Sequence, residues 1–137
     1  MHSLRRRWSA LAFALLLTAT AECSANAVEK KSLEAKVADS DLVITGVVSQ
    51  TLACGAVEVG ECSVTSVTAK IVVHDVLKGV APKEILFRCR ESIAEFSPRA
   101  CEIGKKYLLF LQKDGNGIFH SANGPYGAYD LSQRDGE

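Results

Sequence analysis

The sequence has no excess of positive or negative charge. Sixteen Lys and Arg balance sixteen Asp and Glu, so the formal net charge at pH 7 is zero. A nucleic-acid-binding protein gains affinity from a clustered basic surface. This chain offers local groups such as Arg88/Arg90 and Lys105/Lys106, which are typical of a solvated strand edge and a turn. We therefore expect no nucleic-acid partner.

Residues that could act in catalysis are also few. The three histidines are His2, at the start of the chain, and His74 and His120, on predicted strands. His74 precedes Asp75, but adjacent strand residues point to opposite faces, so this pair cannot face each other. His120 follows Phe119 and is expected to be an outward-facing strand residue. Because a Gly-rich phosphate loop and a Gly-x-Ser-x-Gly nucleophile elbow are absent as well, we expect a non-enzymatic protein.

The spacing of the metal-ligating residue types does not favour a metal site. Zinc accepts thiolate and imidazole ligands, and the candidates are Cys54, Cys62, His74 and His120. Structural zinc sites usually bring paired ligands about two to four residues apart, whereas seven residues separate Cys54 from Cys62. A redox-active Cys-x-x-Cys pair is absent too. We expect no metal and no cofactor.

The start of the chain has the features of a secretion signal. Three arginines, Arg5 to Arg7, precede an apolar run from Trp8 to Ala21 that is shorter than the roughly 20 residues needed to span a bilayer. Small residues then form an A-x-A cleavage site at Ala25-Asn26-Ala27. We predict that residues 1–27 are a signal peptide cleaved after Ala27, that no stable membrane anchor remains, and that the protein is secreted or periplasmic.

The mature chain, residues 28–137, fits one domain and carries a formal charge of about −2, because the leader takes three arginines and one glutamate with it. Its cysteines are an even set in a chain bound for an oxidising compartment, which predicts two disulfides. Four cysteines can form two disulfides in three ways, and we favour the way in which both disulfides close local loops. Each disulfide could stabilise the fold by about 2–4 kcal/mol. The favoured pairs are Cys54–Cys62 and Cys89–Cys101.

The pattern of the mature chain predicts one helix followed by short strands. Helix-forming residues fill 28–39, with Leu33 and Val37 on one face. Gly46 indicates a bend in the first strand, and Asp114-Gly115-Asn116-Gly117 is typical of a tight hairpin turn. Alternating or β-branched runs predict strands at 42–50, 64–76, 84–90, 107–111 and 118–121, separated by loops that include 51–63 and 91–103.

Five short strands at regular spacing favour a small barrel. We predict an all-β fold: an OB-fold-like, five-stranded Greek-key barrel with a short N-terminal helix. Gly124, Pro125 and Gly127 are expected to open a coil, and a short C-terminal helical turn is expected over Asp130–Gln133.

The order of these segments resembles the netrin-like domains, including the inhibitory domain of the tissue inhibitors of metalloproteinases (TIMPs) and the bacterial exported proteins related to them. The resemblance implies an OB-type barrel over residues 28–137. The segments that carry it are Ala38–Ile44, Val76–Gly79, Ala100–Cys101, Gly104–Leu109, Asp114–Gly117 and Leu131–Arg134.

In the family's animal inhibitors, a cysteine at the mature N-terminus places its amine and carbonyl on the protease zinc. Cleavage after Ala27 removes Cys23 with the leader and exposes Val28, and no cysteine lies between Val28 and Cys54. The N-terminal cysteine with which the family's inhibitors bind the protease zinc is therefore absent from the predicted mature chain. Of the four mature cysteines, Cys101 alone matches a family cysteine by position.

We therefore predict an exported, non-enzymatic binding module, monomeric, with a TIMP-like barrel. Its loops 51–63 and 91–103 are expected to contact an extracellular or envelope protein, such as a protease or a glycan-bearing partner. The alternative is a metalloprotease inhibitor that acts by a mechanism other than N-terminal cysteine chelation of zinc.

Overall fold

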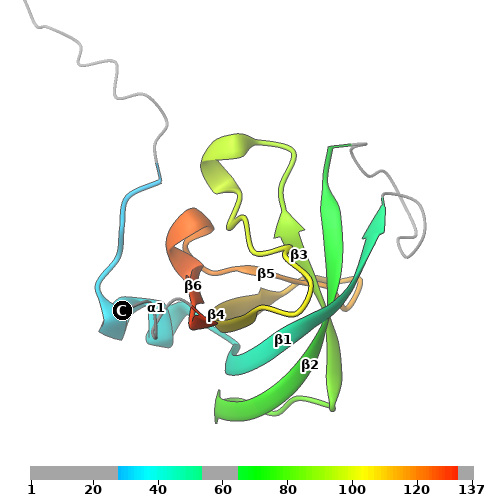
Figure 1. The fold of residues 1–137 in the computed structure, drawn as a ribbon. Helices are drawn as coiled ribbons and strands as arrows, with labels where there is room; N and C mark the ends of the chain where they lie inside the picture. The colour runs from blue at the N-terminus through cyan, green and yellow to red at the C-terminus, as the bar shows by residue number, and fades with distance from the viewer. Residues whose placement is uncertain (1–27, 54–64, 133–137) are drawn as a thin grey trace, which may run out of the picture.

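Alternating apolar residues form five strands that close into a barrel, with one short α-helix outside it (Figure 1). This computed structural model describes residues 28–53 and 65–132. Neighbouring strands follow the order β1-β2-β3-β5-β4, and β4 pairs with β1 to close the ring. The barrel strands are β1 Leu42–Ala53, β2 Val67–Lys78, β3 Glu84–Arg90, β4 Lys106–Lys113 and β5 Phe119–Ser121.

The strand pairing is that of an OB-type barrel. β3 and β5 are parallel, whereas the other four pairs around the ring are antiparallel. A closed ring leaves none of its five strands as an open edge over its full length. The predicted all-β, OB-like barrel with a short N-terminal helix is confirmed.

The barrel interior is filled by the apolar face of each strand. In β3 the alternate residues Ile85, Phe87 and Cys89 are all buried, and in β2 Ala69 and Ile71 are fully buried. Residues from all five strands join one cluster. The two-residue period of these strands therefore identified the core correctly.

Gly46 lies where β1 changes its register against β2, between Thr45 and Gly46. A Cβ at this position would lie 2.5 Å from the Ile71 Cγ2 and 2.8 Å from the Val72 carbonyl oxygen. The two strands therefore approach too closely here to leave room for a side chain, and the shift in register is the irregularity that a glycine within a strand often marks.

The chain after β5 is more regular than the sequence predicts. The 3-10 helix η2, Gly124–Gly127, and the strand β6, Ala128–Asp130, replace the expected coil. β6 pairs with β4 at Tyr107–Leu109, beyond the part of β4 that pairs with β5. Asp130 thus ends a strand, and the helical turn expected over Asp130–Gln133 extends outside the described residues.

The first loop differs from its predicted bounds. β1 continues to Ala53, so residues 51–53, expected in the loop 51–63, belong to the strand. The rest of that loop, with Cys54, Cys62 and their predicted disulfide, lies outside the described residues, as does the predicted signal peptide 1–27. Within residues 28–53 and 65–132, no helix is long and apolar enough to cross a bilayer.

The helix α1, Leu33–Asp39, lies on the outer face of the barrel, near β4 and β6 (Figure 1). It begins at Ser32, whose Oγ accepts a hydrogen bond from the Ala35 N–H. Leu33 and Val37, which share one face of the helix, are 59% and 37% exposed, whereas Lys36 is 2% exposed. The helix therefore packs through a lysine and leaves its apolar pair uncovered.

Candidate functional site

The connection between β3 and β4, residues 91–105, contains the 3-10 helix η1, Ala94–Phe96, and joins the two strands without an α-helix. The disulfide Cys89–Cys101 links this loop to the end of strand β3, with 5.1 Å between the two Cα atoms. Beside it, the Ala100 N–H donates to the Cys89 carbonyl at 3.2 Å. The pairing predicted for these two cysteines is therefore present.

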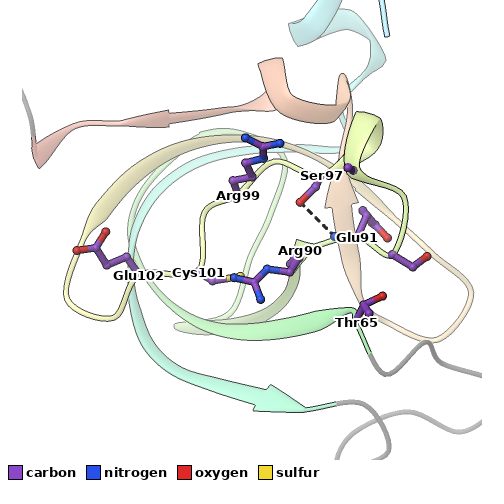
Figure 2. Close-up of a pocket in the computed structure, with 9 residues that line it drawn as sticks. Thr65, Arg90, Glu91, Ser97, Arg99, Cys101 and Glu102 are labelled. Atoms are coloured by element: carbon purple, nitrogen blue, oxygen red, sulfur yellow. Dashed lines mark hydrogen bonds between the residues drawn. The ribbon is translucent and has the colours of Figure 1, made fainter. Parts of the chain in front are cut away.

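A pocket of about 540 Å³ opens between this loop and the end of β3 (Figure 2). Figure 2 shows Arg90 extending toward Cys101, and Arg99 further along the same loop. The walls combine the two arginines with hydroxyl groups and two carboxylates. The lining residues are Thr65, Arg90, Glu91, Ser92, Ala94, Ser97, Arg99, Cys101 and Glu102.

The two carboxylates of the pocket are engaged by their own cations. Glu91 pairs with His120 at 2.8 Å, and Glu102 pairs with Lys105 at 2.8 Å. Neither Arg90 nor Arg99 forms an ion pair with any residue in the described part of the chain. As far as residues 28–53 and 65–132 show, the two guanidinium groups are not neutralised by a carboxylate, and a guanidinium is suited to bind an anionic group of a ligand.

Arg99 has a backbone φ of +54°, which is uncommon for a residue with a side chain. The residues beside it hold it there. Pro98 precedes it, Ala100 is fixed by its bond to Cys89, and Ser97 is buried, with its Oγ accepting a hydrogen bond from the Glu91 N–H. Strain of this kind persists where the surroundings impose it, and it is concentrated at functional sites.

His120 lies between two carboxylates, which the sequence did not reveal. Its Nδ1 is 2.8 Å from Glu91 Oε1, and its Nε2 is 2.8 Å from Asp114 Oδ2. The hydrogen bond to Glu91, opposed by burial and reinforced by Asp114, raises the pKa of His120. Burial would raise the pKa of Asp114, but hydrogen bonds from His120 and the Ile118 and Asn116 N–H groups lower it.

This arrangement, the Glu91–His120–Asp114 triad, lies outside the barrel core, since the neighbouring Phe119 points into it, and it adds two partners to the outward-facing histidine that the sequence predicts. It links the first residue of the β3–β4 loop to the hairpin between β4 and β5. Because both ring nitrogens are held by carboxylates, the imidazole has no free nitrogen with which to activate a nucleophile. The triad therefore serves to brace the loop.

The other sequence candidates are not brought together. His74 is exposed on β2, and its neighbour Asp75 accepts a hydrogen bond from the Thr45 hydroxyl at 2.8 Å. β2 and β5 do not pair, so the strands of His74 and His120 are separated in the sheet. Within the described residues no group of His, Cys, Asp and Glu is placed to hold a metal ion.

The β3–β4 loop also exposes large apolar side chains. Ile93, Phe96 and Ile103 are 52%, 46% and 62% exposed. Exposed apolar side chains and arginines are both common at protein interfaces. The end of β3 and the loop after it therefore bring together a fixed backbone, the guanidinium groups of Arg90 and Arg99, and three exposed apolar side chains.

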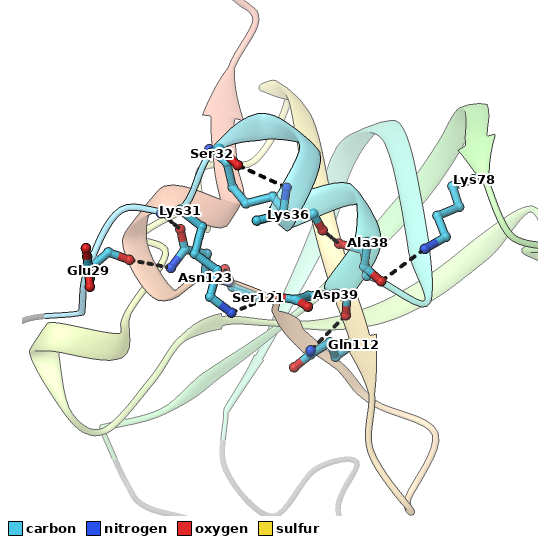
Figure 3. Close-up of polar contacts among 12 residues, drawn as sticks. Glu29, Lys31, Ser32, Lys36, Ala38, Asp39, Lys78, Gln112, Ser121 and Asn123 are labelled. Atoms are coloured by element: carbon cyan, nitrogen blue, oxygen red, sulfur yellow. Dashed lines mark hydrogen bonds and ion pairs between the residues drawn. The ribbon is translucent and has the colours of Figure 1, made fainter.

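The segment before α1 is fixed beside this loop by Asn123, a residue that the sequence analysis did not single out (Figure 3). The Asn123 side chain, 3% exposed, accepts from the Lys31 N–H and donates to the Glu29 carbonyl, each at 2.9 Å. η2, which follows Asn123, contacts η1. A second hollow of about 320 Å³ lies here and is lined by Val28, Ala94, Glu95, Arg99, Pro125 and Tyr126.

Arg99 and Ala94 line both hollows, so the N-terminal segment and the β3–β4 loop form one continuous surface.

A search against models of protein families finds no match for the chain. A search of curated proteins likewise finds no similar sequence. The function must therefore be argued from this surface.

Proposed function

We propose that this protein is an exported, non-enzymatic binding module, and that the surface around Arg90 and Arg99 on its β3–β4 loop contacts a protein partner. The observation that carries the proposal is that Arg90 at the end of β3 and Arg99 on the braced loop have no ion-pair partner among the described residues, while the same loop exposes Ile93, Phe96 and Ile103. We further propose that the chain is a netrin-like domain of the bacterial exported type.

Preorganisation supports a binding role for this loop. The disulfide Cys89–Cys101, the triad at Glu91 and the buried Ser97 each fix the loop before a partner arrives. A loop that is already ordered loses little conformational freedom on binding, which improves affinity. Arginine and aromatic side chains are also the residues that most often dominate interface energy.

Export is supported by the disulfide, because such bonds persist mainly in oxidising compartments. It agrees with the apolar leader that precedes Ala27. Purified intact protein should therefore begin at Val28 when it is recovered from the envelope or the medium of its host. Recovery of most of the protein with residues 1–27 attached would overturn the export proposal.

The binding proposal is tested by affinity capture from the same envelope or medium fraction. The mature wild type is compared with the double variant Arg90→Gln/Arg99→Gln and with a matched double variant, Lys83→Gln/Lys113→Gln, which removes two cations elsewhere. We expect the wild type and the matched control to retain one partner and the arginine variant to lose it by about tenfold or more.

A second pair of variants separates apolar from charged contacts. Phe96→Ser should weaken capture, whereas Val80→Ser, at a side chain 95% exposed on another turn, should not. Capture after enzymatic deglycosylation of the fraction distinguishes a protein surface from a glycan. Equal capture by the wild type and the Arg90/Arg99 variant would overturn the assignment of this surface.

The alternative function, inhibition of a metalloprotease without N-terminal cysteine chelation, is favoured by one observation. Asn123 pins Glu29–Lys31 beside the β3–β4 loop, so a new N-terminus at Val28 would lie on the same surface as Arg99. Purified mature protein should then slow one or more secreted zinc proteases, and Asn123→Ala should abolish the effect. No inhibition across a panel at micromolar concentration would exclude this alternative.

A further inference from the structure

An apolar groove lies between α1 and the outer face of the barrel, away from the β3–β4 loop. Two hollows of about 280 and 430 Å³ make up this groove, and both are lined by Leu33, Leu108 and Phe110. Val43 and Phe110 are buried but belong to the outer face of their strands, because neither is part of the barrel core. The groove is thus a second apolar layer, open on one side.

Hydrogen bonds at both ends hold the helix in the position that leaves this groove open. The Lys78 Nζ donates to the Val37 carbonyl at 2.7 Å, and the Gln112 Nε2 donates to the Asp39 carbonyl at 2.8 Å (Figure 3). At the other end, Asn123 holds Lys31. Leu33, Val37 and Leu77 therefore remain 59%, 37% and 64% exposed along the groove.

The charge around the groove is of one sign. Its two hollows are lined by four lysines and no carboxylate: Lys30, Lys31, Lys36 and Lys78. Lys31 already pairs with Asp39, and Lys78 is used by the helix carbonyls. Lys30 and Lys36 have no ion-pair partner among residues 28–53 and 65–132.

Lys36 is the unusual member of this set, because it is 2% exposed. Its Nζ donates to the Tyr126 carbonyl and the Tyr129 hydroxyl, and lies 4.7 Å from the Tyr129 ring centroid and 5.5 Å from that of Phe110. An ammonium has three donors, and these partners use two of them. A buried cation without a counter-ion is unfavourable, so an anion bound here would be stabilised.

We propose that this groove binds a single-chain amphiphile with an anionic head, such as the carboxylate of a long-chain fatty acid. The chain would lie against Leu33, Leu108 and Phe110, and the head would accept hydrogen bonds from Lys36 and Lys30. Ligand sites of this kind are mostly apolar with a few placed polar groups.

Two other occupants fit less well. An extended peptide carries backbone N–H and C=O groups that need partners, and the apolar hollow offers only Lys78, which is already engaged. A membrane surface is met by a projecting apolar face, whereas Leu108 and Phe110 lie at the floor of a hollow. An alkyl chain needs no hydrogen bonds and fills a hollow.

The test is calorimetry on the mature protein with three probes that share a twelve-carbon chain: dodecanoate, dodecanol and dodecyltrimethylammonium, each below its micelle concentration. We expect dodecanoate to bind saturably at one site, about tenfold or more tighter than the alcohol, because hydrogen bonds to charged groups are the stronger ones. The cationic probe should not bind saturably. A carboxyl-labelled dodecanoate should show a shifted ¹³C resonance that titrates at lower pH when bound.

Variants assign the roles. Lys36→Met keeps the aliphatic stem and should bring acid and alcohol to within about twofold of each other. Leu33→Gln should weaken both probes, and Val80→Gln, outside the groove, should change neither. Lys30→Gln, at an exposed side chain, should reduce acid binding with an unchanged fold even where Lys36→Met perturbs it.

Three results would overturn the proposal. They are the absence of saturable dodecanoate binding, equal affinity for all three probes, and binding only to phosphatidylglycerol vesicles, which would make the groove a membrane-docking face. Loss of the partner by Arg90→Gln/Arg99→Gln with dodecanoate binding intact would show that the two surfaces act independently.

Discussion

The inside of the barrel and the layer beneath α1 are both buried, yet they are built from different chemistry. Inside, residues such as Phe87, Ile71 and Leu109 are fully covered by apolar neighbours from several strands. Beneath α1, the buried residues are Phe110, Val43 and a lysine. The first layer is closed, whereas the second is open along a groove. The comparison separates what stabilises this fold from what is available for binding.

The largest expected effect tests this difference with two phenylalanines of nearly equal burial. Phe87 is 0% exposed in the barrel, and Phe110 is 2% exposed under α1. Phe87→Ala should lower the free energy of unfolding by about 3–5 kcal/mol, because its cavity has no open side. Phe110→Ala should cost at least about 1 kcal/mol less, because its site already opens to the groove.

Urea denaturation of both variants, with m-values compared, measures the difference. Equal losses would show that the outer layer is packed as completely as the barrel interior. The proposed ligand groove would then be a minor surface depression.

The disulfide comes next in size and tests what orders the β3–β4 loop. Replacing both Cys89 and Cys101 by alanine opens a link between residues 12 apart in sequence. We expect a loss of about 2–4 kcal/mol, the usual range for a loop of this length. Faster hydrogen exchange at the Ala100 N–H, which bonds to the Cys89 carbonyl, would report local opening.

The loop has a second brace in the triad at Glu91, so the barrel should stay folded without the disulfide. Exchange in β1 and β2 is the internal reference, and it should change no more than the global stability does. Complete unfolding of the double alanine variant at room temperature would show that the disulfide, not the strands, determines the fold.

A substitution at Gly46 tests how closely β1 and β2 pack against each other in the barrel. In Gly46→Ala the new Cβ would lie 2.5 Å from Ile71 Cγ2 and 2.8 Å from a backbone oxygen. Such overpacking should cost about 1–3 kcal/mol. Gly115→Ala, where a Cβ meets nothing within 4 Å, is the matched control and should change stability little. Thermal unfolding of the two variants decides whether β1 and β2 can separate locally.

The same two layers explain how much could be predicted from the sequence. The alternation at Ile85, Phe87 and Cys89, the hairpin at Asp114–Gly117 and the local cysteine pair are short-range signals, and they located the barrel strands and the loop. Lys36 meets Tyr126 across 90 residues, and Asn123 meets Lys31 across 92. No local pattern marks such contacts, because they exist only once the chain has folded.

The same limit of short-range signals applies to the candidate site: its loop was predicted, but the long-range contacts that hold the loop were not. The segment 91–103 was expected to be a loop because it carries Pro98, Cys101 and mixed charge, and barrel loops commonly bind partners. His120 was expected to face outward, but a strand pattern describes one strand at a time and cannot show that Glu91, 29 residues earlier, lies opposite its ring. The sequence offered one signal for the triad. Asp114 begins the predicted hairpin turn, six residues before His120, so the two side chains could be expected near each other.

The smallest expected effect concerns the triad and its dependence on pH. The pKa of His120 is raised in the folded protein, so its contribution is fully present below the unfolded pKa of about 6.5 and is lost as the pH rises through the folded value. The pKa of Asp114 is lowered, so its contribution is present above about 3.9 and is lost as the pH falls through the folded value.

The triad should therefore stabilise most between about pH 4 and 6.5. Because its side chains are 23–33% exposed, the effect should be only about 1 kcal/mol. Urea unfolding from pH 5 to 9 should show the wild type losing its advantage over His120→Gln as the pH rises. His74→Gln, exposed on β2, should keep the wild-type profile. A wild-type advantage that grows with pH would mean that His120 is neutral in the fold and that the loop is braced by the disulfide alone.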